Sequence, residues 1–133
     1  MKGKLQMTKK ETFFVEGDFS FEKLEKCYPE IFSDIPRVCA IAGCSYLDCL
    51  LNDLLKLRLV EDKHLFDKKI ERLTFEKRID LCFLTGIIRK EMHTDLIIIK
   101  EIRNKFAHEI KINNFDSEDI PQKCSAIKIN EAF

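Results

Sequence analysis

The residues best suited to chemistry lie in one short run, Arg103-Asn104-Lys105-Phe106-Ala107-His108. A guanidinium is permanently charged and can grip a phosphate through two hydrogen bonds, and an imidazole can accept a proton near neutral pH. Arg103 and His108 could therefore cleave RNA without a metal. The imidazole would take the proton of the 2′-hydroxyl, and the guanidinium would stabilise the charge of the phosphorane. Asn104 could orient the phosphate or the neighbouring backbone.

The spacing of this pair leaves a second interpretation open. Residues five apart on an α-helix point about 140° apart, so Arg103 and His108 converge only if the helix ends before His108 or if a dimer joins two copies. In the structural interpretation, Arg103 pairs with an acid of a neighbouring helix, Asp48 or Asp80. His108 then lies at the negative C-terminal end of its helix, and Asn104 ties the loop that follows.

The segment that carries these residues reads as a long helix over 89–108. Apolar residues recur at the three-four spacing that places side chains on one stripe, and Ile97 and Ile98 add apolar surface outside that stripe. A helix that is apolar around much of its circumference belongs in the middle of a bundle. The stripe consists of Met92, Leu96, Ile99, Ile102 or Arg103, and Phe106.

Start and stop signals place the other elements. Pro36 in a first turn predicts a helix over 36–59. Thr74 predicts a cap for a helix over 75–85, and Gly86 is the left-handed residue expected just after its end. Shorter helices are expected over 20–29 and 116–128, with a connector of at most one helical turn over 61–72. The sequence therefore predicts an all-α fold, a compact single-domain bundle of four to six helices. Residues 1–18 are expected to form a basic tail and a docking segment, Phe13 to Val15, and residues 19–133 the helical domain.

Composition restricts the possible functions. The 133 residues contain 23 Lys+Arg and 23 Asp+Glu, so the formal net charge is zero, which argues against a general polyanion binder. The six cysteines contain no C-x-x-C pair, and we expect reduced core side chains, no metal and no cofactor. The N-terminus lacks the apolar core of a signal peptide, and no apolar run approaches the roughly 20 residues of a membrane span. We therefore expect a cytoplasmic location.

Direct DNA binding is not expected. A helix-turn-helix could be drawn through Gly86, with Arg89, Lys90, His93 and Lys100 facing DNA. However, the helix over 89–108 is too apolar to lie in a DNA groove, because its apolar side chains are needed in the core. His64 and His93 are expected to be solvated. The basic residues from Lys68 to Arg78 alternate with acids and are interpreted as a solvated, mixed-sign face.

Three segments together resemble the mannitol operon repressor (MltR) family: residues 40–60, 73–88 and 95–108. The most specific matches are Phe75-x-x-Arg78-Ile79-Asp80, Gly86 and the run from Arg103 to His108, and the resemblance covers about residues 35–108. It implies a compact helical domain without an obvious DNA-reading motif. Members are named as transcriptional regulators of sugar-alcohol uptake operons. The Arg-polar-x(3)-His ending is also similar to that of HEPN domains, helical dimers many of which cut RNA without a metal.

These observations predict an MltR-like transcriptional regulator or protein-interaction domain that acts through protein contacts, with a protein partner and a homodimer. The alternative is a HEPN-like ribonuclease that uses Arg103 and His108, with RNA as its substrate. In the first case Asp48, Asp80, Arg103, Asn104 and His108 form a structural polar network. In the second, Arg103, His108 and Asn104 are catalytic.

Overall fold

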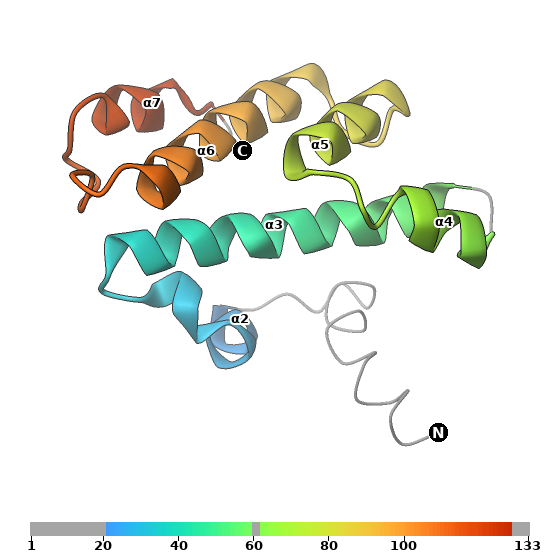
Figure 1. Cartoon of the computed structure of the whole chain (residues 1–133), viewed down its shortest axis with the longest axis horizontal. Coiled ribbons are helices and arrows are strands. Elements are labelled where there is room, and N and C mark those ends of the chain that lie inside the picture. The colour runs from blue at the N-terminus through green and yellow to red at the C-terminus, as the bar shows by residue number, and fades with distance from the viewer. Residues whose placement is uncertain (1–20, 60–61, 129–133) are drawn as a thin grey trace.

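A computed structural model describes residues 21–59 and 62–128, and all regular structure in these ranges is helical (Figure 1). The all-α prediction is confirmed for them. The elements are α2 (Phe21–Cys27), the 3-10 helix η1 (Pro29–Phe32), α3 (Pro36–Arg58), α4 (Lys63–Lys69), α5 (Phe75–Leu84), α6 (Lys90–His108) and α7 (Ile120–Ala126). The predicted tail and docking segment lie outside the described residues.

The longest helix, α3, begins at Pro36 as predicted, because proline lacks the N–H that a first turn leaves unpaired. Of the described helices, α3 is the one long and apolar enough to cross a membrane by length and composition, which the sequence-based expectation missed. Here its buried residues Cys44, Leu51 and Leu55 pack against α5 and α6. The core helix of a globular domain meets the same criterion, although only 17% of the apolar window of α3 is buried.

The helix pair α5–α6 follows its local signals. Thr74 Oγ1 accepts a hydrogen bond from the Lys77 amide at 3.3 Å, and Gly86 has the left-handed φ of 76° expected just after a helix end. The central helix α6 then contacts α3, α5 and α7. This arrangement confirms that the apolar helix lies in the middle of the bundle.

Two shorter elements differ from their predictions. The connector contains α4, a seven-residue helix, because the Asp62 side chain caps it by accepting from the Leu65 amide at 2.9 Å. The last helix, α7, begins at Ile120 rather than near Asp116, and Pro121 lies in its first turn as expected.

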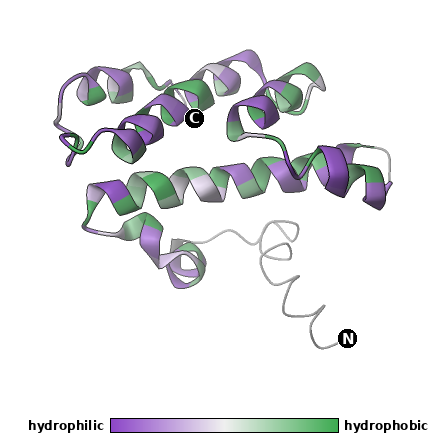
Figure 2. Cartoon of the chain, viewed as in Figure 1, coloured by the Kyte–Doolittle hydropathy of each residue, from purple (hydrophilic) through white to green (hydrophobic). Residues whose placement is uncertain are grey.

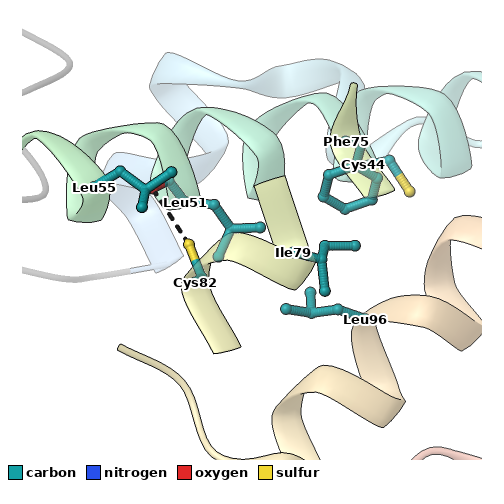
Figure 3. Packing of buried hydrophobic residues seen from close by; sticks show 7 residues of the cluster. All are labelled: Cys44, Leu51, Leu55, Phe75, Ile79, Cys82 and Leu96. Atoms are coloured by element: carbon teal, nitrogen blue, oxygen red, sulfur yellow. Dashed lines mark hydrogen bonds between the residues drawn. The ribbon is translucent and has the colours of Figure 1, made fainter. Parts of the chain in front are cut away.

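The core consists of two apolar clusters. Figure 3 shows the first cluster, which joins α3, α5 and α6 through Cys44, Leu51, Leu55, Phe75, Ile79, Cys82 and Leu96. The second lies between α6 and the C-terminal part of the chain and consists of Ile102, Phe106, Ile112 and Ile120. Apolar and polar residues alternate along α3 and α6 in Figure 2, as expected for helices that bury one side.

Of the six cysteines expected in the core, Cys44 and Cys82 are buried there, whereas Cys27, Cys49 and Cys124 are exposed. Burial raises the pKa of the Cys44 and Cys82 thiols to about 11, so both are neutral at physiological pH. The Cys82 thiol donates to the Leu51 carbonyl at 3.8 Å, the contact drawn in Figure 3. Both side chains therefore serve as small hydrophobic groups.

Candidate functional site at the end of α6

The α6 helix continues without a break through His108, and the Glu109 amide still donates to the Lys105 carbonyl at 3.0 Å. Arg103 and His108 therefore keep their helical separation of about 140°. Arg103 is partly buried, whereas His108 is exposed. Within one chain, the two residues face different surroundings.

The Arg103 guanidinium lies beside its sequence neighbour and an aromatic ring. Its Nε donates to Asn104 Oδ1 at 2.9 Å, and its Cζ lies 6.0 Å from the centroid of the Phe75 ring. Its two terminal amines make no hydrogen bond within residues 21–59 and 62–128. Arg103 therefore retains the part of its fork that binds carboxylates and phosphates.

The acids expected to pair with Arg103 have other partners, which corrects the predicted pairing. Asp48 of α3 accepts a hydrogen bond from Arg78 Nη1. Asp80 of α5 lies 2.8 Å from His93 Nε2. Arg78 takes Asp48 because both residues lie at the packed α3–α5 contact, whereas Arg103 comes from the last turns of α6. The predicted network is thus divided into separate pairs.

Arg78 is the most important residue that the sequence interpretation misplaced. It was assigned to a solvated mixed-sign face, but only 5% of it is exposed. Its Nη2 donates to the carbonyls of Ile70 at 3.0 Å and Glu71 at 3.2 Å, which follow α4. The signal was present in the spacing, because Phe75, Arg78, Ile79 and Cys82 share one helical stripe. Arg78 thus joins the end of α4 to α3 through α5.

The residues considered for DNA recognition on α6 are largely engaged with α5. His93 is not solvated as expected: its side chain is 17% exposed, and its ring centroid lies 5.0 Å from that of Phe83. Lys90 lies over the same Phe83 ring at 5.2 Å. Lys100 pairs with Glu76 at 3.3 Å. These contacts hold this side of α6 against α5.

A second arginine, Arg37 in the first turn of α3, closes the end of α6. Its Nε donates to the Phe106 carbonyl at 2.6 Å, and its Nη2 donates to the carbonyl of Ile112 at 2.6 Å. Longer bonds from Nη2 reach the carbonyls of Glu109 at 3.2 Å and Ile110 at 3.4 Å. The last carbonyls of a helix have no hydrogen-bond donor within the helix, and the Arg37 side chain supplies donors to them. No local pattern predicts this contact, because its partners lie 69 to 75 residues away.

An ion-pair cluster connects α6 to the segment before α7. Lys105 Nζ lies 2.6 Å from Asp119 Oδ1 and 3.8 Å from Glu118 Oε2. The hydrogen bond to Asp119 raises the pKa of Lys105, and the same bond lowers the pKa of the Asp119 carboxyl. The pair therefore stabilises the fold between acid pH and the alkaline range.

We expect Lys105→Met to lower stability at pH 7 and to lower it less at pH 3. The Asp119 contribution is fully present above the ordinary carboxyl pKa of 3.8 and is lost as pH falls through its lower value in the folded state. Urea midpoints of the wild type and the variant at both pH values test this, with exposed Lys68→Met as the control. A difference between wild type and Lys105→Met that is as large at pH 3 as at pH 7 would contradict the ion-pair explanation.

Metal binding finds no support in the part of the chain that the structure describes, where no group of three or more His, Cys, Asp or Glu side chains could hold an ion. Comparisons with models of protein families, with curated proteins and with solved structures found no match. The MltR and HEPN resemblances therefore rest on the motif residues alone.

Proposed function

We propose that this chain is an MltR-like regulatory domain that acts through protein contacts and forms a homodimer. The observation that carries the proposal is an exposed group of apolar side chains at the start of α3, here called the α3 apolar surface: Phe32, Ile35, Val38 and Ile41. Their exposed fractions are 43%, 60%, 37% and 36%. Contiguous exposed apolar groups mark protein contacts more often than isolated ones do.

Two of these side chains share one side of α3. Val38 and Ile41 are three residues apart, and residues at that spacing are neighbours on a helix, while Ile35 is the extended residue directly before α3. Phe32 precedes them at the end of η1. Burying such side chains between two copies removes apolar area from water at about 25 cal/mol per Å². The engagement of α6 with α5 and the zero net charge also favour protein contacts over a direct reading of DNA.

Sedimentation equilibrium tests the dimer. We expect the wild type to dimerise at micromolar concentration and Val38→Asp/Ile41→Asp to be monomeric, because two carboxylates would be buried without partners. Leu57→Asp is the matched control, since Leu57 is 65% exposed at the other end of α3 and lies outside the surface. The assignment would be refuted if the wild type were still monomeric at about 100 µM, which corresponds to a dimerisation free energy weaker than about −5.5 kcal/mol. Equal loss of dimer in the control would refute it as well.

A HEPN-like ribonuclease is the second candidate, and one observation favours it. His108 is exposed and the Arg103 terminal amines have no partner in the described chain, so a two-fold dimer could bring the arginine of one copy to the histidine of the other. A chain that works through protein contacts alone predicts no RNA cleavage.

Incubation with labelled RNA in EDTA separates the two candidates. Cleavage that falls about 100-fold or more in both Arg103→Ala and His108→Ala would establish the ribonuclease, since general acid–base groups contribute about that factor. Arg58→Ala is the control, because Arg58 is an exposed cation at the far end of α3. Cleavage that persists in all three variants would instead indicate a contaminating nuclease.

A further inference from the structure

Two exposed cysteines flank a contact between two tyrosine rings, where the chain after α2 meets α3 (Figure 1). The ring centroids of Tyr28 and Tyr46 are 4.7 Å apart, and the ring planes are inclined at 56°. Cys27 is the last residue of α2 and directly precedes Tyr28. Cys49 lies three residues after Tyr46 on α3, so the two are neighbours on the helix surface. The ring contact therefore brings Cys27 and Cys49 to the same part of the fold.

The acidity of the two tyrosines shows that both thiols lie near the same hydroxyl group. Burial raises the pKa of Tyr28 to about 12, and the charges of Cys49, Tyr46 and Cys27 raise it further. Burial and then Cys27 raise the pKa of Tyr46 as well. Electrostatic effects of this kind weaken with distance. The sulfur atoms of Cys27 and Cys49 are therefore close to one phenol oxygen, and so to each other.

The attachment of α2 allows the adjustment that a disulfide requires. The Cα atoms of a disulfide lie within about 7 Å of each other. Among residues 22–27 only Leu24 is buried, and in the described chain neither core cluster contains a residue of α2. A seven-residue helix held by one buried side chain can shift towards α3 while the core stays as it is.

The other four cysteines are less suited to such a link. Cys44 and Cys82 are buried, and burial raises the pKa of both thiols to about 11, which suppresses the reactive thiolate. The Cys39 thiol donates to the Ile31 carbonyl at 3.0 Å. Cys124 is exposed, but it belongs to α7, which packs on α6. Cys27 and Cys49 are thus the two exposed cysteines that a single contact brings together.

We propose that Cys27 and Cys49 form a reversible disulfide that ties α2 to α3, with a small disulfide such as oxidised glutathione as the oxidant. One protein thiolate attacks a sulfur of the oxidant, which gives a mixed disulfide and releases one glutathione thiolate. The second protein thiolate attacks the protein sulfur of the mixed disulfide and displaces the other glutathione. The two protein thiols lose two electrons and two protons, and the oxidant becomes two molecules of reduced glutathione. Because exposed disulfides are readily reduced, the link is reversible.

This inference is independent of the proposed dimer, since both cysteines belong to one copy. Val38→Asp/Ile41→Asp should lose the dimer and still form the link as the wild type does. A disulfide between copies would instead give a covalent dimer on a non-reducing gel, and that result would overturn the proposal.

Mass spectrometry of the full chain tests the link. The reduced protein is equilibrated with mixtures of oxidised and reduced glutathione, and the remaining thiols are then alkylated. We expect a single chain that has lost two hydrogen atoms and carries no glutathione, and a tryptic digest in which the peptide of Cys27 is joined to that of Cys49. Glutathione attached to both cysteines without a link between them would overturn the proposal.

Serine variants identify the two members of the pair. Trypsin leaves Cys39, Cys44 and Cys49 on one peptide, because residues 38–55 contain no lysine or arginine. Cys27→Ser and Cys49→Ser should each stop at a mixed disulfide that carries one glutathione. Cys39→Ser is the matched control and should form the link, as should Cys124→Ser. Loss of the link in Cys39→Ser or Cys124→Ser would show that a different cysteine is the partner, and the proposal would be wrong.

The effect of the link on α2 is measured separately. Oxidation should raise the urea midpoint of the wild type, since a disulfide restricts the unfolded chain, and it should slow amide exchange in α2. Cys49→Ser, treated in the same way, should show neither change. Its midpoint before oxidation should equal that of the reduced wild type, because Cys49 is exposed. Unchanged amide exchange in α2 of the linked wild type would contradict a tie between α2 and α3.

Discussion

Replacing Arg78 with alanine should lower the free energy of unfolding by about 3 kcal/mol, measured by urea denaturation at pH 7. Removing one member of a buried ion pair costs about 3–5 kcal/mol, because the other charge is left without a partner. The Arg78 side chain is 6% exposed, but that of Asp48 is 31% exposed, so water can partly solvate the abandoned carboxylate. This places the effect at the lower end of the range. Lys77→Ala, an exposed neighbour on α5, should change stability by less than about 0.5 kcal/mol.

Further variants of the same site separate the ion pair from the contacts to the backbone. Arg78→Met with Asp48→Leu removes both charges, which is often neutral for a buried pair. Here it should recover only part of the loss, because the carbonyls of Ile70 and Glu71 still lack their donor. Hydrogen exchange should then be faster in α4. If Arg78→Ala is as stable as the wild type, the guanidinium does not hold the end of α4.

The features that sequence analysis predicted correctly are those with local causes. Pro36 sets the start of α3, Thr74 directly precedes α5, and Gly86 lies two residues after its end. Each signal acts within a few residues of its own position. The central place of α6 followed from its apolar run, since burying that much surface requires packing on several sides.

The polar pairs were not predicted, because the choice of partner is a tertiary property. Asp48 had five arginine or histidine candidates on the helices α4, α5 and α6, and the sequence does not say which comes within reach. The observed partner, Arg78, is 30 residues away, and it was assigned to solvent because its neighbours in sequence are charged. Its position in a core stripe is better information than the polarity of the surrounding segment. A charged residue at a core position therefore predicts a buried ion pair, whose partner lies on another element.

The same reasoning explains why the end of α6 could be identified but not interpreted. The sequence places Arg103 and His108 on one helix, and α6 keeps them there. Whether the Arg103 guanidinium has an acidic partner depends on which other cations pair with the nearby acids. In the structure Arg78 and His93 take them, and this leaves the terminal amines of Arg103 without a hydrogen-bond partner among residues 21–59 and 62–128. The candidate site therefore depends on the pairing elsewhere in the core.

Replacing Arg37 with alanine should lower the free energy of unfolding by about 3 kcal/mol, a second large effect in this domain. Arg37 donates to the carbonyls of Phe106 and Ile112 at 2.6 Å, and each hydrogen bond from a charged donor contributes about 1.5–3 kcal/mol when its acceptor is removed from water. The two longer bonds, to Glu109 and Ile110, add little because the two hydrogens of Nη2 are shared among three carbonyls and the shortest of these bonds goes to Ile112. Urea denaturation measures the loss, with exposed Arg58→Ala as the control.

Two further measurements show whether geometry or charge gives Arg37 its effect. Arg37→Lys keeps the charge near the negative end of α6 but presents a point donor instead of a planar fork, so it should recover less than half of the loss. Amide exchange in Arg37→Ala should accelerate at Ile112 and the last turn of α6, and remain slow at Leu55. The reason is that only the second core cluster depends on this cap, since Phe106 and Ile112 both belong to it. Full recovery by lysine would show that a positive charge at this helix end is sufficient, and uniform acceleration across both clusters would show that the two halves of the core unfold as one unit.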